Sequence, residues 1–168
     1  MKNLSGLLNK AKKSRFYLWL LNWVLHRAIP FNAPHNFEII KITNEELTVK
    51  MPYIRKNKNH INGLHACGLA TLCEYACGLQ LMNATDISQY RIIMKSLQMD
   101  YHFQGKIDVF ATFNLSKKWV EENVKPDLET AEGIFRTFEV KVFDTKQNHI
   151  CTAKINWQIK LWSKVKSN

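Results

Sequence analysis

A single carboxylate stands in the least charged part of this chain. Between Asn59 and Thr85, in the stretch NHINGLHACGLATLCEYACGLQLMNAT, the one formally charged side chain is Glu74. Such a group costs free energy in an apolar setting unless it is paired or hydrogen-bonded, and burial shifts its pKa and restricts the water around it. The alternative is a surface position, but a solvated helix face normally carries several charges. Glu74 is therefore a candidate general base or nucleophile.

Three groups that precede Glu74 in the sequence could assist it. Asn59 lies in a polar loop over residues 53–63 and could orient a water molecule or the carboxylate. His65 could hold that loop or polarise a carbonyl group. The backbone N–H of Ala66, at the predicted start of a helix, could receive an oxyanion with help from the helix dipole. Each side chain also has a purely structural interpretation, since His65 can begin a helix and Asn59 can form a turn.

A long central helix over residues 65–82 must position these groups. Apolar residues recur at helical spacing along one stripe, and Glu74 belongs to another face. The neighbours of Glu74 on that face are all small, so that a substrate, a strand or a partner helix can approach closely. They are Cys67, Ala70, Thr71, Cys77 and Gly78.

The remainder of the chain predicts an antiparallel sheet. The segment over residues 151–161 alternates apolar and polar side chains most cleanly, as expected for a strand with one buried face. A charged connection over residues 116–130 interrupts the strands, with a short helical turn near Trp119. One apolar helix among such strands predicts an α+β fold with the sheet curled around the helix. The expected strands cover residues 37–41, 46–52, 91–101, 106–114, 137–143 and 151–161.

An aromatic helix is predicted before this domain. Residues 15–27 form it, after a basic segment, and its apolar run of ten residues is too short to span a bilayer. It either docks on the domain or lies on a membrane surface, where Trp19, Trp23 and a basic flank would suit a peripheral contact. We therefore divide the chain into residues 1–34, an amphipathic helix and linker, and residues 35–168, the main domain.

The charge and the cysteine content of the chain limit the classes of binding partner and metal site that are expected. The formal net charge of +10 favours anionic partners without choosing among nucleic acid, lipid and a phosphorylated ligand. The four cysteines form no CxxC pair and fit no zinc module, so no metal site is expected. Buried, reduced cysteines of this kind predict a cytoplasmic protein.

The loop and helix around Glu74 resemble those of the hot-dog-fold acyl-CoA thioesterases of the phenylacetate-degradation type. That family has an Asn and a Gly-bearing loop, then His-Gly-Gly at the start of the central helix, and an Asp or Glu nine residues after the His. Asn59, Gly63, His65 and Glu74 match this pattern. The likeness in plan covers about residues 35–162. The whole chain also resembles an uncharacterised hot-dog subgroup with an extra aromatic helix at its N-terminus.

The sequence departs from that family at three positions. Ala66 and Cys67 stand where the family has two glycines, and Ile92 stands where many members have Ser or Thr on the strand after the helix. A non-catalytic module that binds an acyl chain or a lipid is therefore the alternative function. A hot-dog dehydratase is disfavoured because the Pro-rich segment around its His is missing.

The resemblance implies a hot-dog fold and the hydrolysis of an acyl-CoA or acyl-carrier thioester. Glu74 would activate water or attack directly, with acyl-CoA as substrate and no separate cofactor. It also implies a homodimer or a dimer of dimers, with Asn59 and Glu74 contributed by different subunits. We expect no nucleic-acid partner, because aromatic and basic residues do not interleave as on an RNA-binding sheet. The candidates for contacting the CoA phosphates are Arg55, Lys56, Lys58 and Arg91, with Lys117 and Lys118.

Overall fold

The structure is a computed structural model that describes residues 2–165, in which five α-helices and six strands are present. The predicted division at residue 34 stays a prediction, and its outer limits, residues 1 and 166–168, lie outside the described residues. The helices are α1 (Lys2–Ala11), α2 (Arg15–Ala28), α3 (Ala66–Ala84), α4 (Lys117–Asn123) and α5 (Lys125–Thr130). The strands are β1 (Glu38–Ile42), β2 (Glu46–Met51), β3 (Tyr90–Tyr101), β4 (Val109–Asn114), β5 (Ile134–Asp144) and β6 (His149–Leu161).

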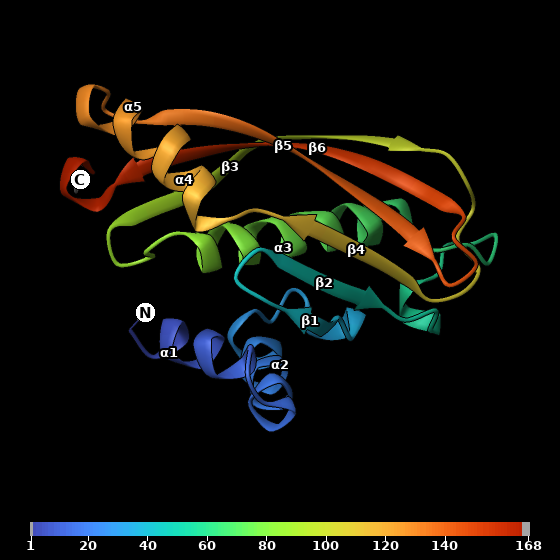
Figure 1. The fold of residues 1–168 in the computed structure, drawn as a ribbon. Helices are drawn as coiled ribbons and strands as arrows, with labels where there is room; N and C mark the ends of the chain where they lie inside the picture. Colours follow the sequence, from blue (N-terminus) through green and yellow to red (C-terminus); the bar gives the residue numbers. More distant parts are fainter. Residues whose placement is uncertain (1, 166–168) are drawn as a thin grey trace.

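One antiparallel sheet wraps around the central helix. Its strand order is β1-β2-β4-β5-β6-β3, and α3 packs against β2 to β6 (Figure 1). On β6 the residues Ile155, Trp157 and Ile159 are buried, as the alternating sequence predicts. The predicted α+β fold with a sheet curled around one helix is therefore confirmed.

Helix α3 is buried on most of its circumference, which explains why its sequence is apolar nearly all round. Two of its glycines allow close approach to the sheet. A Cβ at Gly68 would lie 2.8 Å from the terminal methyl carbon of Met51, and one at Gly78 would lie 3.1 Å from the indole ring of Trp157. The helix ends at Ala84, two residues later than predicted.

Strand β3 forms one edge of the sheet and contains a bulge. Its register with β6 shifts between Met94 and Ser96, so that Lys95 is the extra residue. Because side chains alternate between the faces of a strand, the bulge turns Leu97 toward α3 in place of Ser96. This shift decides which residues of β3 face the central helix.

The opposite edge of the sheet, strand β1, is covered by α2. The side chain of Asn22, the one polar residue in the apolar run of the helix, pairs with the backbone of Ile39. Its Oδ1 accepts from the Ile39 N–H at 2.7 Å, and its Nδ2 donates to the Ile39 carbonyl at 3.0 Å. The amide thus satisfies backbone groups that an edge strand would leave unpaired.

The N-terminal region contains more helix than predicted. Helix α2 agrees with the prediction over residues 15–27, but α1 was missed, and its Leu8 and Ala11 are buried in the same core as α2 and α3. Helix α2 thus docks on the domain, which was one of its two predicted placements. None of the helices within residues 2–165 has both the length and the apolar character needed to cross a bilayer.

Predicted and observed bounds differ most in three segments. One is β5, which begins at Ile134, three residues before the predicted start. The strand expected over residues 106–114 begins only at Val109, because Asp108 instead caps the segment after β2 by accepting from the N–H of Tyr53 at 2.8 Å. The connection over residues 116–130 holds two short helices, α4 and α5, where a single turn was expected.

Candidate active site

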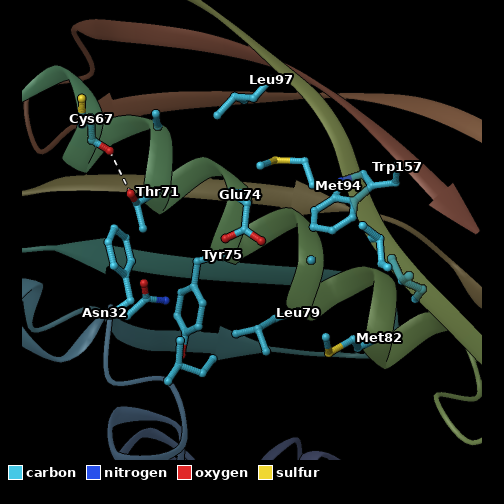
Figure 2. Close-up of a pocket in the computed structure, with 16 residues that line it drawn as sticks. Asn32, Cys67, Thr71, Glu74, Tyr75, Leu79, Met82, Met94, Leu97 and Trp157 are labelled. Carbon is cyan, nitrogen blue, oxygen red and sulfur yellow. Dashed lines mark hydrogen bonds between the residues drawn. The ribbon is translucent and has the colours of Figure 1, made fainter. Parts of the chain in front are cut away.

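Glu74 lies in the wall of a cleft of about 670 Å³ on the face of α3 that the sheet leaves open (Figure 2). The size is in the range of ligand-binding pockets. The cleft runs between α3, strand β3 and the segment that follows α2. Its lining is mainly apolar and consists of Ile29, Phe31, Asn32, Cys67, Ala70, Thr71, Glu74, Tyr75, Gly78, Leu79, Met82, Ile92, Ile93, Met94, Leu97 and Trp157.

The small side chains around Glu74 on α3 leave room for close approach, as the sequence predicts. Ala70, Thr71 and Gly78 line the cleft beside Glu74, and their short side chains leave the carboxylate accessible. Cys77 is the exception, because it is fully buried and accepts a hydrogen bond from the indole N–H of Trp157 at 3.3 Å. Burial raises the pKa of Cys77 to about 12, so its sulfur is an unreactive thiol at neutral pH.

The Glu74 carboxylate is half-buried, and no side chain among residues 4–165 pairs with it. Burial raises the pKa of Glu74 above that of an exposed glutamate. The nearby Thr71 hydroxyl donates to the Cys67 carbonyl at 2.9 Å and so is occupied by the helix itself (Figure 2). A desolvated carboxylate with a raised pKa in a cleft is a stronger base than one in water, which is what general-base chemistry requires.

We expect Glu74→Gln to stabilise the folded protein at neutral pH. Because the folded pKa of Glu74 lies above its unfolded value, the wild-type protein loses stability as the pH rises through the interval between the two. Below that interval both states bind the proton and the penalty vanishes. Thermal unfolding should therefore give a higher midpoint for Glu74→Gln at neutral pH and converging midpoints in acid. A midpoint for Glu74→Gln below that of wild type at neutral pH would contradict the burial of an unpaired charge.

His65 caps the central helix. Its side-chain Nδ1 accepts a hydrogen bond from the Cys67 backbone N–H at 3.1 Å. The backbone N–H of His65 donates to the Asn57 carbonyl at 2.8 Å. The side chain is exposed and lies outside the cleft lining. In the described subunit His65 therefore caps the helix, and its catalytic role stays a prediction.

Asn59 and Ala66 also lie outside the lining of the cleft. The Asn59 Oδ1 accepts from the N–H groups of Ile61 and Gly63 at 3.0 and 2.9 Å, which closes the loop before α3. Ala66 is exposed at the first position of α3, and its carbonyl accepts from the Tyr101 hydroxyl at 2.9 Å. Within one subunit, then, the structure does not bring Asn59, His65 or Ala66 to the cleft beside Glu74.

Four of the six basic candidates lie at different places around the site. Arg55 and Lys56 are exposed on a short 3-10 turn, and the Lys58 ammonium stacks over the Tyr53 ring at 3.9 Å. Arg91 is half-buried on β3, donates to the Gln158 side chain at 3.2 Å and directly precedes Ile92 of the cleft wall. Their role in contacting CoA phosphates stays a prediction.

Two polar groups of the cleft were missed from the sequence. Asn32 is largely buried in the segment after α2 and contributes a side-chain amide to the lining, close to Tyr75 in Figure 2. Burial, and then the charge of Glu74, raise the pKa of the Tyr75 hydroxyl. No spacing pattern points to Asn32, because it belongs to the N-terminal region and reaches the site only through the docking of α2.

The pattern of the DUF4442 family, a domain of unknown function, matches residues 18–159, and the chain belongs to that family. The match begins within α2 and ends within β6. No curated protein is similar enough in sequence to count as a match.

Solved structures share the fold at low identity. A Pseudomonas aeruginosa protein of unknown function, described as a probable thioesterase, superposes with a TM-score of 0.77 at 18% identity, covering 84% of this chain and 94% of its own. A thioesterase from Haemophilus influenzae gives 0.67 at 13% identity, with 89% and 94% covered. A mutant thioesterase from Staphylococcus aureus gives 0.63 at 17% identity, with 78% and 98% covered. The predicted hot-dog fold is thereby confirmed.

Proposed function

We propose that the protein is a thioesterase that hydrolyses an acyl-CoA or acyl-carrier thioester in the Glu74 cleft. The observation that carries the proposal is a half-buried carboxylate, without a partner among the described residues, in the wall of a mainly apolar cleft. An apolar cleft suits an acyl chain, and the thioester carbonyl would then lie beside Glu74. The thioesterases that share the fold make this reaction class the first to test.

The chemistry follows from the state of Glu74. As general base, the carboxylate takes a proton from water while the water oxygen bonds to the thioester carbon. The carbon–sulfur bond then breaks, and the departing thiolate takes a proton, so that an acid and a thiol are released. In the nucleophilic version, Glu74 attacks the thioester carbon, the carbon–sulfur bond breaks and the thiolate leaves, and water then hydrolyses the resulting anhydride to the acid and free Glu74. Asn32 is our proposed hydrogen-bond donor in the cleft, in the role first expected of Asn59.

We further propose that two copies pair through β3. This strand is the free edge of the sheet over 12 residues and exposes the large apolar side chains of Ile93 and Met94. Such an edge readily pairs with a second copy, and a two-fold arrangement closes the assembly. Ile93, Met94 and Leu97 line the cleft, so a partner at β3 would stand next to it and could bring its own Asn59 to Glu74. Light scattering that gives a monomeric mass would contradict the pairing.

The alternative is a module that binds an acyl chain without hydrolysing it. It is favoured by the absence of Asn59, His65 and Ala66 from the lining of the cleft within one described subunit. Ile92 also places an aliphatic side chain in the wall where many related enzymes have a hydroxyl. This alternative predicts that acyl-CoA binds equally to the wild-type protein and to Glu74→Gln.

Thiol release from acyl-CoAs of short, medium and long chain decides between the two functions. The proposal predicts turnover on at least one chain length by the purified wild-type protein. Saturable acyl-CoA binding with no thiol release on any chain length would contradict the enzyme and support the binding module. We place the activity in the cytoplasm, in keeping with four cysteines that form no disulfide.

A further inference from the structure

We propose that α2 docks the protein on an anionic membrane surface, with the mouth of the Glu74 cleft close to the lipid. The outward stripe of α2 carries Phe16, Trp19 and Trp23, whose exposed fractions are 62%, 59% and 46%. The outer face of a surface helix is ordinarily polar or charged. Burial of Leu21 and Leu25, with the Asn22 contact to β1, fixes the inner side of this helix. The three aromatic rings are therefore not needed to hold α2 on the domain.

The exposed rings form one continuous patch with cations and with β1. The Phe16 and Trp19 ring centroids lie 6.0 Å apart, and the Arg27 guanidinium stacks 3.8 Å from the Trp23 ring. Ile40 of β1, 41% exposed, lines a groove with Trp19 and Arg15, in which Glu38 is the one acid. We call Arg15, Phe16, Trp19, Trp23, Arg27 and Ile40 the docking face.

The charge around the docking face selects an anionic partner. The first 37 residues contain six Lys or Arg and no Asp or Glu. Tryptophan favours the interface between lipid headgroups and acyl chains, and cations near it are attracted by anionic lipids. Rings that insert beside cations that contact headgroups fit a lipid bilayer better than a flat protein surface. The docking face also lies at the β1 edge, opposite the β3 edge of the sheet, so that docking and pairing can coexist (Figure 1).

The docking face continues along the chain into the cleft. Helix α2 ends at Ala28, and both Ile29 and Phe31 line the cleft, although 72% of the Phe31 surface is exposed. An acyl chain that leaves the bilayer beside α2 would meet these apolar side chains before it reaches Glu74. If the proposed thioesterase function holds, on which this step rests, the preferred substrates are thioesters whose acyl chain is long enough to partition into lipid.

Vesicle sedimentation tests the docking directly. We expect the wild-type protein to pellet with vesicles that contain phosphatidylglycerol, to pellet weakly with pure phosphatidylcholine, and to be released by high salt. The double variant Trp19→Ser/Trp23→Ser should partition about tenfold less, which corresponds to about 1.4 kcal/mol. The double variant Arg15→Gln/Arg27→Gln should bind the phosphatidylglycerol vesicles less, and its remaining binding should no longer depend on salt. Phe135→Ser is the matched control, since Phe135 is 43% exposed on β5 and also has a cation, Lys95, over its ring. It should bind like wild type.

Four results would overturn the docking. The first three are a wild-type protein that stays in the supernatant, a tryptophan variant that pellets like wild type, and a wild-type oligomer that the same variant dissociates without vesicles, since the face would then join copies of the chain. The fourth is displacement of the protein from vesicles by a DNA oligonucleotide, at the same DNA concentration for wild type and the tryptophan variant. It would indicate nonspecific binding through the cations.

The readouts separate this inference from the proposed function. Glu74→Gln should pellet like wild type although its hydrolysis falls by about 10²–10⁴-fold, and the tryptophan variant should hydrolyse a short, water-soluble acyl-CoA like wild type. Vesicle-borne long-chain acyl-CoA should be hydrolysed about tenfold more slowly by the tryptophan variant, in proportion to its lost partitioning. Equal rates on vesicle-borne substrate would contradict the link between docking and the cleft, while absence of any turnover with normal pelleting would contradict the thioesterase alone.

Discussion

Glu74→Gln is expected to lower kcat/KM for acyl-CoA hydrolysis by about 10²–10⁴-fold, the usual contribution of a general base. The substitution keeps the size of the side chain and removes only its ability to accept a proton from water. The loss should fall on kcat, with KM nearly unchanged, because the interaction strengthens only in the transition state. Steady-state thiol release by purified wild type and variant measures it.

Thr71→Val is the matched control for this variant. Thr71 lies one helical turn before Glu74 in the same cleft wall, and its hydroxyl is already bonded to the Cys67 carbonyl. It should therefore retain activity within about threefold, far from the loss expected of a general base. A Glu74→Gln enzyme that keeps more than about a tenth of wild-type activity would exclude both the base and the nucleophile roles.

Asn57→Ala is expected to destabilise the protein by about 3 kcal/mol, because it leaves several buried groups without partners. Asn57 is 1% exposed. Its Nδ2 donates to the carbonyls of His35 and Pro52 at 2.9 and 2.8 Å, and its Oδ1 lies 2.9 Å from His35 Nδ1. The midpoint of thermal unfolding should fall by about 6–12 °C for a domain of this size.

Asn59→Ala provides the comparison, since Asn59 is two residues away and only partly buried. Its two hydrogen bonds go to backbone N–H groups of a surface loop, and their loss should cost about 1 kcal/mol. Equal shifts for the two variants would contradict the view that Asn57 holds the loop after α2 against the end of β2.

The sequence contained most of the information about the central helix and its carboxylate. A lone charge in an apolar stretch identified Glu74, and small neighbours at helical spacing identified the open face, because both are local properties of one helix. The alternation along β6 gave its buried face for the same reason. The prediction lacks α1, although its Leu8 and Ala11 lie in the core.

The rest of the site depends on long-range packing that spacing does not encode. Asn32 reaches the cleft only because α2 docks on β1 through Asn22, and Leu97 faces α3 only because Lys95 forms a bulge. Asn59 and His65 match the family pattern in their spacing from Glu74. Within one subunit, however, these side chains serve the loop and the helix cap.

A crystal structure of Glu74→Gln with a non-hydrolysable acyl-CoA analogue tests the central claim most directly. We predict that the acyl chain lies in the cleft between α3 and β3, with the carbon that replaces the thioester carbonyl in contact with the side chain of residue 74. An analogue whose acyl chain lies elsewhere, with residue 74 facing only solvent, would contradict the assignment of this cleft as the active site.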